Sequence, residues 1–175
     1  MNPGELDGRI GEGWSGEAPN GSHVNVVLAQ RGSPTAAAAI SMFAHPAPGH
    51  TPVLVCVGET PADYEPVWPP TLMMNKGTAL DERHQTMTWG AAQLGIAQGV
   101  LDAVADGLLE TSGDVLVLVA VWVDPGAHDQ TAVRKANRTA TRKAIGVCVE
   151  GRDQAAAAAL VERRNSVQSP FYSGE

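Results

Sequence analysis

Cysteine and basic residues are both scarce in this chain of 175 residues. The two cysteines, Cys56 and Cys148, stand in separate apolar segments and form no CxxC pair. We therefore expect buried thiols in a reducing compartment, with no disulfide and no zinc site. The chain has 12 lysines and arginines and 19 aspartates and glutamates, which gives a formal net charge of −7. This balance argues against a nucleic-acid partner, because such domains carry a basic stripe that displaces counterions.

Long apolar runs and familiar catalytic motifs are missing as well. The longest strongly apolar run covers residues 115–123, which is too short to cross a bilayer as a helix, and the N-terminus lacks the basic and apolar regions of a signal peptide. We therefore expect a cytoplasmic protein with no membrane contact. The chain has no phosphate-binding glycine loop and no GxSxG motif. His45 and His50 bracket the helix-breaking PAPG, so we expect exposed loop histidines and no metal site.

Length and composition indicate a single domain. The hydrophobic fraction of 43% is ordinary for a globular protein, and a chain of this length can bury a substantial core. Residues 1–10 are polar and rich in glycine, so we expect a flexible N-terminal arm there and one domain over residues 11–175.

The order of apolar patterns predicts a mixed α/β protein. Ser33 can cap a helix that begins at Pro34 and ends before the HPAPG at residues 45–49. The four prolines within residues 59–70 predict a loop. We expect an α+β sandwich whose mixed sheet carries its helices on one face, with strands near 13–18, 23–30, 51–58, 71–78 and 114–123, helices over 82–109, 128–151 and 153–166, and an extended tail.

Two of these segments allow more detailed predictions. The branched residues of 114–123 are typical of a central strand buried on both sides. Gly90, Gly95 and Gly99 interrupt the helix over 82–109, which favours close packing against a neighbouring element. An apolar stripe along that helix follows the spacing of Met87, Ala91, Leu94, Leu101, Val104 and Leu108.

The stretch HVNVVLAQRGSP, residues 23–34, raises the question of function. Strand side chains alternate between faces, so His23 and Asn25 project from one face while Val24 and Val26 project from the other. Two polar residues on one face are consistent with a solvated sheet surface or with the wall of a pocket. The residues alone leave both interpretations open.

Several blocks together resemble a known family. HVNVVLAQRGSP, TPVLV, TLMMNKGT, GAAQLGIAQGVLDAVADGLL, DVLVLVAVWV and RRNSVQSPF occur in the order and approximate spacing of the formaldehyde-activating enzymes, from about Gly11 to Phe171. The resemblance implies that formaldehyde condenses with the reduced pterin tetrahydromethanopterin to give the 5,10-methylene derivative and water. It also implies the ribosomal protein S5 domain 2-like fold and a homopentamer with active sites between subunits.

The resemblance also implies roles for individual residues. The family's acid histidine corresponds to His23. Asn25 stands where the family pattern has aspartate, and the segment around Thr60–Pro70 carries an insertion. The pterin contacts correspond to Asn25, Leu54, Lys76, Thr78 and Gln93.

The chemistry of the condensation agrees with these residue types. Hydroxide is a poor leaving group, so an acid must protonate the departing hydroxyl of the hemiaminal, and histidine exchanges protons near neutral pH. Leu54 would offer an apolar surface and Gln93 an amide that donates and accepts. Because Asn25 lacks the carboxylate charge, the activity is expected to be slower, shifted to lower pH or directed to another pterin or aldehyde. The alternatives are a non-catalytic protein that binds a reduced pterin or formaldehyde, and an enzyme for tetrahydrofolate or another aldehyde.

Overall fold

The described residues form a mixed, five-stranded sheet. The computed structural model describes residues 5–79, 81–170 and 172–174, without the side chain of Phe43. The strand order is β1 (Ile10–Ser15), β2 (Ser22–Gln30), β7 (Val115–Val123), β6 (Thr71–Asn75) and β3 (Val53–Leu54). Strands β6 and β7 are parallel, and the other neighbours are antiparallel. The predicted mixed sheet with 114–123 at its centre is confirmed.

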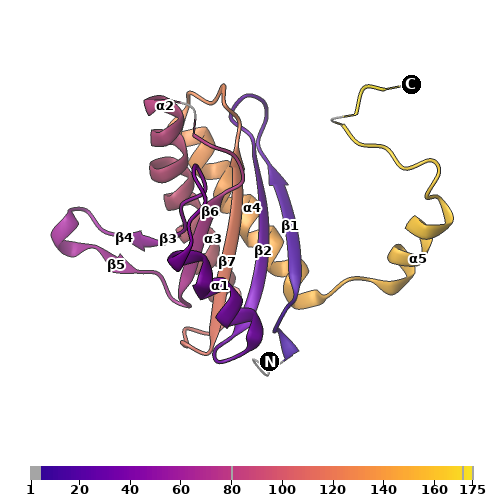
Figure 1. Ribbon diagram of the computed structural model, residues 1–175, viewed down its shortest axis with the longest axis horizontal. Helices are drawn as coiled ribbons and strands as arrows, with labels where there is room; N and C mark the ends of the chain where they lie inside the picture. Colours follow the sequence, from indigo (N-terminus) through magenta and orange to yellow (C-terminus); the bar gives the residue numbers. More distant parts are fainter. Residues whose placement is uncertain (1–4, 80, 171, 175) are drawn as a thin grey trace.

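The two longest helices cover one face of this sheet. Helices α3 (Gln93–Ala105) and α4 (Gln130–Glu150) lie behind the sheet in Figure 1, whereas α1 (Pro34–Ala44) lies in front of it. The α1 residues Ala39 and Met42 line a cavity together with Val27 and Leu118 of that front face. The prediction that the helices pack on one face therefore holds for α3 and α4 but is wrong for α1.

Local capping explains where two of the helices begin. The Ser33 side chain accepts a hydrogen bond from the Ala36 backbone amide at 3.0 Å, with Pro34 in the first turn. In the same way, the Asp129 side chain accepts from the Ala132 amide at 3.0 Å and starts α4. These side chains satisfy backbone donors that have no partner within the helix. The predicted helix start at Pro34 is confirmed, and α4 begins two residues after the predicted residue 128.

The helix predicted over 82–109 is divided into three parts. A short α2 (Glu82–Gln85) leads into a π-helical segment, η3 (Thr86–Ala92), and α3 then ends at Ala105. The predicted apolar stripe is partly wrong, because Leu94 and Leu101 are exposed whereas Ile96 and Val100 are buried. The π-helical segment changes the angular spacing of side chains, so a stripe with regular helical spacing cannot continue across it.

Two glycines of α3 allow α3 and α4 to lie in close contact. A Cβ atom on Gly95 would lie 2.3 Å from the Arg134 carbonyl oxygen, and one on Gly99 would lie 2.6 Å from the Arg138 carbonyl oxygen. A Cβ atom on Gly90 would meet nothing within 4 Å. The predicted close packing is confirmed at Gly95 and Gly99 and is wrong at Gly90.

Replacing Gly95 or Gly90 by alanine should change the free energy of unfolding in opposite directions. Gly95→Ala should lower the free energy of unfolding by about 1–3 kcal/mol, because the α4 backbone must move away. Gly90→Ala should raise it by about 0.5–1 kcal/mol, because alanine restricts the unfolded chain without a clash. Urea unfolding of both variants measures the difference. Equal shifts would show that the α3–α4 spacing is not limited by Gly95.

The predicted strand over 51–58 is divided between two sheets. Strand β3 joins the main sheet, whereas β4 (Cys56–Val57) pairs with β5 (Glu65–Pro66) in a separate hairpin. Val55, which lies between β3 and β4, is fully buried, and Leu54 is 41% exposed. The predicted proline-rich loop thus contains β5 and a 3-10 turn, η2 (Pro61–Asp63). Both cysteines are free, and Cys148 is buried as predicted, but Cys56 is only half-buried because it lies in this projecting hairpin.

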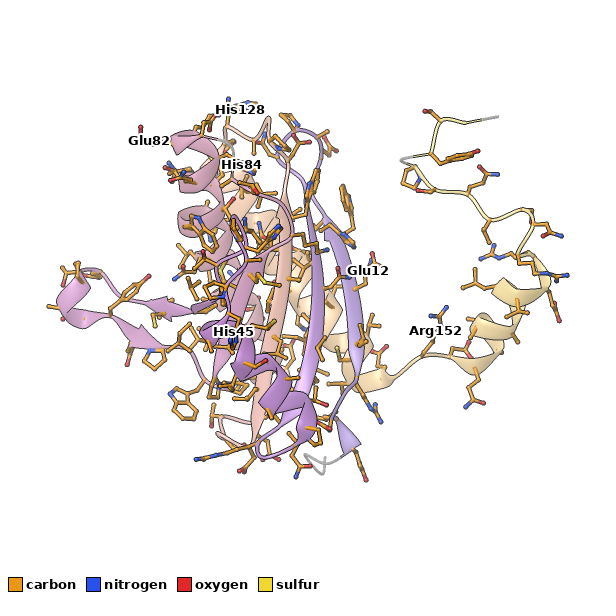
Figure 2. All side chains as sticks on the ribbon, viewed as in Figure 1. Glu12, His45, Glu82, His84, His128 and Arg152 are labelled. Carbon is orange, nitrogen blue, oxygen red and sulfur yellow. The ribbon has the colours of Figure 1, made fainter. Side chains whose placement is uncertain are left out.

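The C-terminal segment projects from the body of the molecule. Helix α5 (Gln154–Glu162) begins at its cap Asp153 and buries no residue. Figures 1 and 2 show the chain leaving α4 near Arg152 and extending beyond β1. At the other end of the chain, residues 1–4 of the predicted arm lie outside the described residues, whereas Leu6 is buried and the Gly8 amide donates to the Leu28 carbonyl at 2.9 Å. The division into an arm and one domain stays a prediction.

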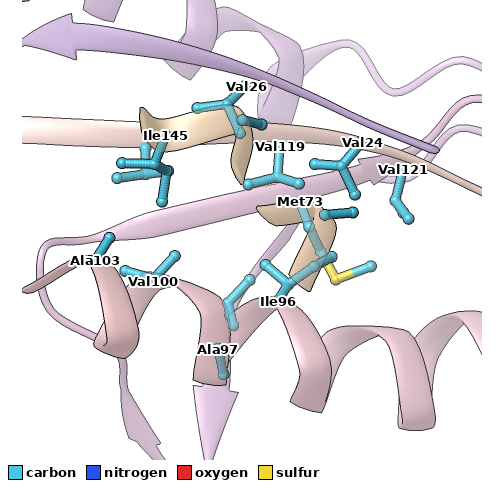
Figure 3. Close-up of a cluster of buried hydrophobic side chains, with 14 of the residues drawn as sticks. Val24, Val26, Met73, Ile96, Ala97, Val100, Ala103, Val119, Val121 and Ile145 are labelled. Carbon is cyan, nitrogen blue, oxygen red and sulfur yellow. The ribbon is translucent and has the colours of Figure 1, made fainter. Parts of the chain in front are cut away.

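The hydrophobic core lies between the sheet and the helices α3 and α4. Figure 3 shows Val24, Val26, Val119 and Val121 of the sheet facing Ile96, Val100 and Ile145 of the helices. Side chains of β7 alternate between buried and half-buried, so the prediction that this strand is buried on both sides is wrong. The sheet has one fully covered face, and the opposite face, which we call the open face, carries the odd-numbered residues of β2. In the described part of the chain, no helix has the length and apolar character needed to span a membrane.

Candidate functional site

His23 lies in a row of side chains that crosses the open face. In the strand register, Trp14 of β1 and Trp122 of β7 are the neighbours of His23 on either side. The ring centroids of Trp14 and His23 are 5.7 Å apart, and the Trp14 and Trp122 rings stack at 5.7 Å. Lys76 follows β6 and donates its backbone amide to the Val121 carbonyl at 2.7 Å. Four segments of the chain therefore meet around one imidazole.

A second row lies one pleat away on the same face. Glu12 of β1 is paired with Asn25 of β2, which in turn is paired with Ala120 of β7. A cavity of about 810 Å³ lies against both rows and against the C-terminal tail. Its size is within the range of small-molecule sites, about 300–1,000 Å³. The lining residues are Glu12, Trp14, His23, Asn25, Gln168, Ser169 and Pro170.

Both ring nitrogens of His23 have charged neighbours. Nδ1 lies 2.9 Å from the Lys76 ammonium nitrogen, and Nε2 lies 3.2 Å from Oε1 of Glu12. Because an ammonium group only donates and a carboxylate only accepts, the neutral ring accepts at Nδ1 and donates its proton from Nε2. The two contacts fix both the orientation of the ring and its tautomer.

Burial shifts the protonation of the two bases in this group. Desolvation, followed by the nearby Lys76 charge, lowers the pKa of His23, and Glu12 opposes this shift. Desolvation lowers the pKa of Lys76 to about 8, again opposed by Glu12. At pH 7 roughly a tenth of Lys76 is therefore neutral, a far larger share than for a lysine with an ordinary pKa near 10.4. His23 and Lys76 can therefore exchange a proton with each other near neutral pH.

The remaining predicted site residues lie elsewhere on the chain. Leu54 is paired with Leu72 at the β3 edge of the sheet. Gln93 at the start of α3 donates to the Cys56 carbonyl at 3.1 Å and to the Tyr64 hydroxyl at 2.9 Å. Thr78 lines a separate, small cavity of about 80 Å³ that also reaches Trp122. The fold thus brings together His23, Asn25 and Lys76, while Leu54 and Gln93 lie toward the opposite edge.

Sequence reasoning missed Glu12, the two tryptophans and the tail. Glu12 stands in GRIGEG, beside the segment expected to be a flexible arm. The available signal for a half-exposed strand was that Glu12 and Trp14 alternate with Gly11 and Gly13. Nothing in the sequence pattern places Gln168–Pro170 beside His23.

The other histidines are not among the residues that line this cavity. Figure 2 shows Glu12 on β1, His84 and His128 at one end of the sheet, and His45 near α1. His84 is buried and its Nε2 lies 3.1 Å from the Val123 carbonyl. The expected exposure is confirmed for His45, but His50 is half-buried, with Nδ1 2.9 Å from the Asn75 carbonyl. Within residues 5–79, 81–170 and 172–174, no group of three or more histidine, cysteine or acidic side chains is arranged to hold a metal ion.

Comparison with known proteins agrees with the resemblance drawn from the sequence. The chain is 33% identical over 168 residues to the 5,6,7,8-tetrahydromethanopterin hydro-lyase of Methanosarcina barkeri, a match that covers 95% of this chain and 91% of that protein. It is 30% identical to the bifunctional enzyme Fae/Hps of Methanococcoides burtonii and 28% identical to that of Methanothrix thermoacetophila. These two matches cover 81% of this chain but only 35% and 36% of the bifunctional proteins. The family model described as formaldehyde-activating enzyme (Fae) matches residues 10–172, and the chain belongs to this family.

Proposed function

We propose that the protein catalyses the condensation of formaldehyde with tetrahydromethanopterin to 5,10-methylenetetrahydromethanopterin and water. Family membership and the name of the Methanosarcina relative support this reaction. The structural observation that carries the proposal is the His23 ring, held between Lys76 and Glu12 at the wall of a cavity of about 810 Å³.

His23 is the acid in this reaction. A pterin nitrogen attacks formaldehyde to give a hemiaminal, whose hydroxyl leaves as water only after it is protonated. His23 delivers that proton, and the Glu12 carboxylate stabilises the imidazolium before the transfer. Trp14 offers an aromatic face to the pterin ring, and Asn25 on the same side of β2 offers an amide that donates and accepts.

The complete site requires more than one copy of the chain. We place Leu54, Thr78 and Gln93 in the pterin site, as the resemblance implies, with the Leu54 and Gln93 edge of one subunit completing the His23 cavity of the next in a homopentamer. The exposure of large apolar side chains along the open face supports such contacts, with Ile10 at 69% and Leu54 at 41%. We further propose the S5 domain 2-like classification for the fold and a cytoplasmic location, for which the two free cysteines are suited.

Stopped-flow measurement of the methylene product tests the proposed function. The protein should accelerate product formation above the uncatalysed rate and should saturate with tetrahydromethanopterin. Saturable pterin binding without any acceleration would identify a non-catalytic binding protein instead. Faster turnover with tetrahydrofolate than with tetrahydromethanopterin would identify a different pterin substrate.

Asn25→Asp should increase turnover and shift its pH dependence. The added carboxylate lies two residues from His23 on the same face, so it should raise the pKa of His23 and extend activity to higher pH. A gain of about 1 kcal/mol from a charge-assisted hydrogen bond corresponds to roughly fivefold faster turnover. The pH–rate profile of the variant measures both effects.

Gln130→Glu is the matched control, because it adds the same charge at the exposed start of α4. If both variants alter turnover equally, or if Asn25→Asp slows it, the amide at position 25 is not a weakened replacement for a carboxylate.

A further inference from the structure

We propose that Lys76 is a nucleophile that carries formaldehyde covalently, as an N-methylene iminium ion, before the one-carbon unit passes to the pterin. In this proposal Lys76, His23 and Glu12 form a catalytic triad of nucleophile, base and orienting carboxylate. The inference rests on the proposed function. It replaces the direct attack of the pterin on formaldehyde by transfer from Lys76, and so assigns Lys76 a role beyond pterin contact.

The geometry matches the general arrangement of an activated nucleophile. Such a nucleophile lies within about 2.6–3.2 Å of a base, and a third group orients the base. Here the Lys76 nitrogen lies 2.9 Å from Nδ1 of His23, and Oε1 of Glu12 lies 3.2 Å from Nε2. His23 can therefore accept a proton from the Lys76 ammonium group at Nδ1 while Glu12 stabilises the resulting imidazolium through Nε2. Among the described residues, His23 on β2 and Glu12 on β1 are ionisable groups that interact with Lys76.

The surroundings of Lys76 differ from those of the other two lysines. Lys76 is half-buried beside His23, whereas Lys135 and Lys143 are exposed on α4. Desolvation favours the neutral amine, and its effect lowers the pKa of Lys76 to about 8. A neutral amine has the lone pair that attacks a carbonyl carbon, which an ammonium group lacks. Lys76 is thus the lysine whose environment prepares it for reaction with an aldehyde.

The proposed steps conserve atoms and charge. The Lys76 amine forms a bond to the formaldehyde carbon, and a carbinolamine results once its oxygen is protonated and the nitrogen loses a proton. The His23 imidazolium then protonates the hydroxyl, which leaves as water while the nitrogen lone pair forms the C=N bond. In total, neutral Lys76, formaldehyde and the His23 imidazolium give the iminium ion, water and neutral His23. Attack by the two pterin N–H groups forms the N–CH₂–N bridge and releases Lys76 as its ammonium ion.

Reductive trapping tests this inference. The full-length protein is treated briefly with ¹³C-formaldehyde and cyanoborohydride at pH 7.5, and peptide mass spectrometry then measures methylation at each lysine. Lys76 should be methylated about 10–100-fold faster than Lys135 and Lys143, because far more of it is neutral at this pH. Simple accessibility predicts the reverse order, since Lys76 is the least exposed of the three. Labelling of Lys76 at or below the rate of the other two lysines would overturn the proposal.

Variants and a chase experiment connect the adduct to turnover. Lys76→Arg keeps the positive charge but should abolish the fast labelling and lower the catalysed rate at least tenfold. Lys143→Arg should change neither the fast labelling at Lys76 nor the catalysed rate. When reduced pterin is added to the protein preincubated with formaldehyde, the trappable adduct should disappear at the rate at which product forms. An adduct that disappears more slowly than product forms contradicts the proposed role.

The outcomes separate this inference from the proposed function. Catalysis by the wild-type protein without preferential labelling of Lys76 would leave the proposed function intact and refute the covalent step. Preferential labelling of Lys76 without acceleration of the condensation would refute the proposed function while supporting a reactive lysine at this site.

Discussion

His23→Ala should lower the catalysed rate of methylene formation by about 10²–10⁴-fold at pH 7, the usual contribution of a positioned general acid. The side chain is only 30% exposed and lies at the centre of the Glu12–His23–Lys76 group. Its removal therefore leaves the departing hydroxyl without a proton donor and Lys76 without its base. Stopped-flow traces with the uncatalysed rate subtracted measure the loss.

His128→Ala is the matched control for this variant. His128 is exposed in the loop before α4, where its ring nitrogen lies 3.2 Å from the Gly126 carbonyl. The control should keep the wild-type rate, and both variants should retain the wild-type circular dichroism spectrum. A folded His23→Ala protein with the wild-type rate would exclude His23 as the acid.

Glu12→Gln should slow the reaction by about tenfold near pH 8 and by less near pH 6.5. A hydrogen bond to a charged group contributes about 1.5–3 kcal/mol, and the lower end applies here because Glu12 is 63% exposed to screening solvent. The sign of the pH effect follows from the contacts. Glu12 raises the pKa of both His23 and Lys76, so its loss lowers both values and moves each limb of the pH–rate profile to lower pH.

Glu17→Gln removes the same charge from an exposed position in the turn between β1 and β2 and should leave the profile unchanged. Glu12→Asp should recover part of the rate by restoring a carboxylate. If Glu12→Gln shows the wild-type profile, the carboxylate does not control the protonation of His23, and its contact with the ring has no catalytic consequence.

Short patterns in the sequence are sufficient to predict several elements of the fold. Ser33 stands at the predicted helix start, where its side chain caps the backbone, and the branched residues of 115–123 do form the central strand. Each prediction rests on interactions between residues near one another in the chain, and such interactions are encoded in short patterns.

The role of GRIGEG could not be predicted, because it depends on contacts with a distant helix. A Cβ atom on Gly11 would lie 2.0 Å from the Ala144 carbonyl oxygen, and one on Gly13 would lie 2.1 Å from the Ala140 carbonyl oxygen. The two glycines therefore allow β1 to lie directly against the α4 backbone, and the pleat then directs Glu12 to the open face. From the sequence alone, a flexible arm is expected up to residue 10 and a strand only from about residue 13, so Glu12 falls outside both predictions.

The meeting of His23 and Lys76 likewise depends on topology. These residues are 53 positions apart, and they come into contact because β6 joins the sheet next to β7 and parallel to it. The resemblance assigned both residues to one site, but their direct contact and the involvement of Glu12 became visible only with the strand order.

A crystal structure of the protein with bound tetrahydromethanopterin tests the central claim most directly. We expect the reduced pterin on the open face of the sheet, with its reacting nitrogens beside His23 and Lys76 and its ring against Trp14. A pterin bound away from these three side chains, with the His23 cavity empty, would contradict the assignment of this face as the catalytic site.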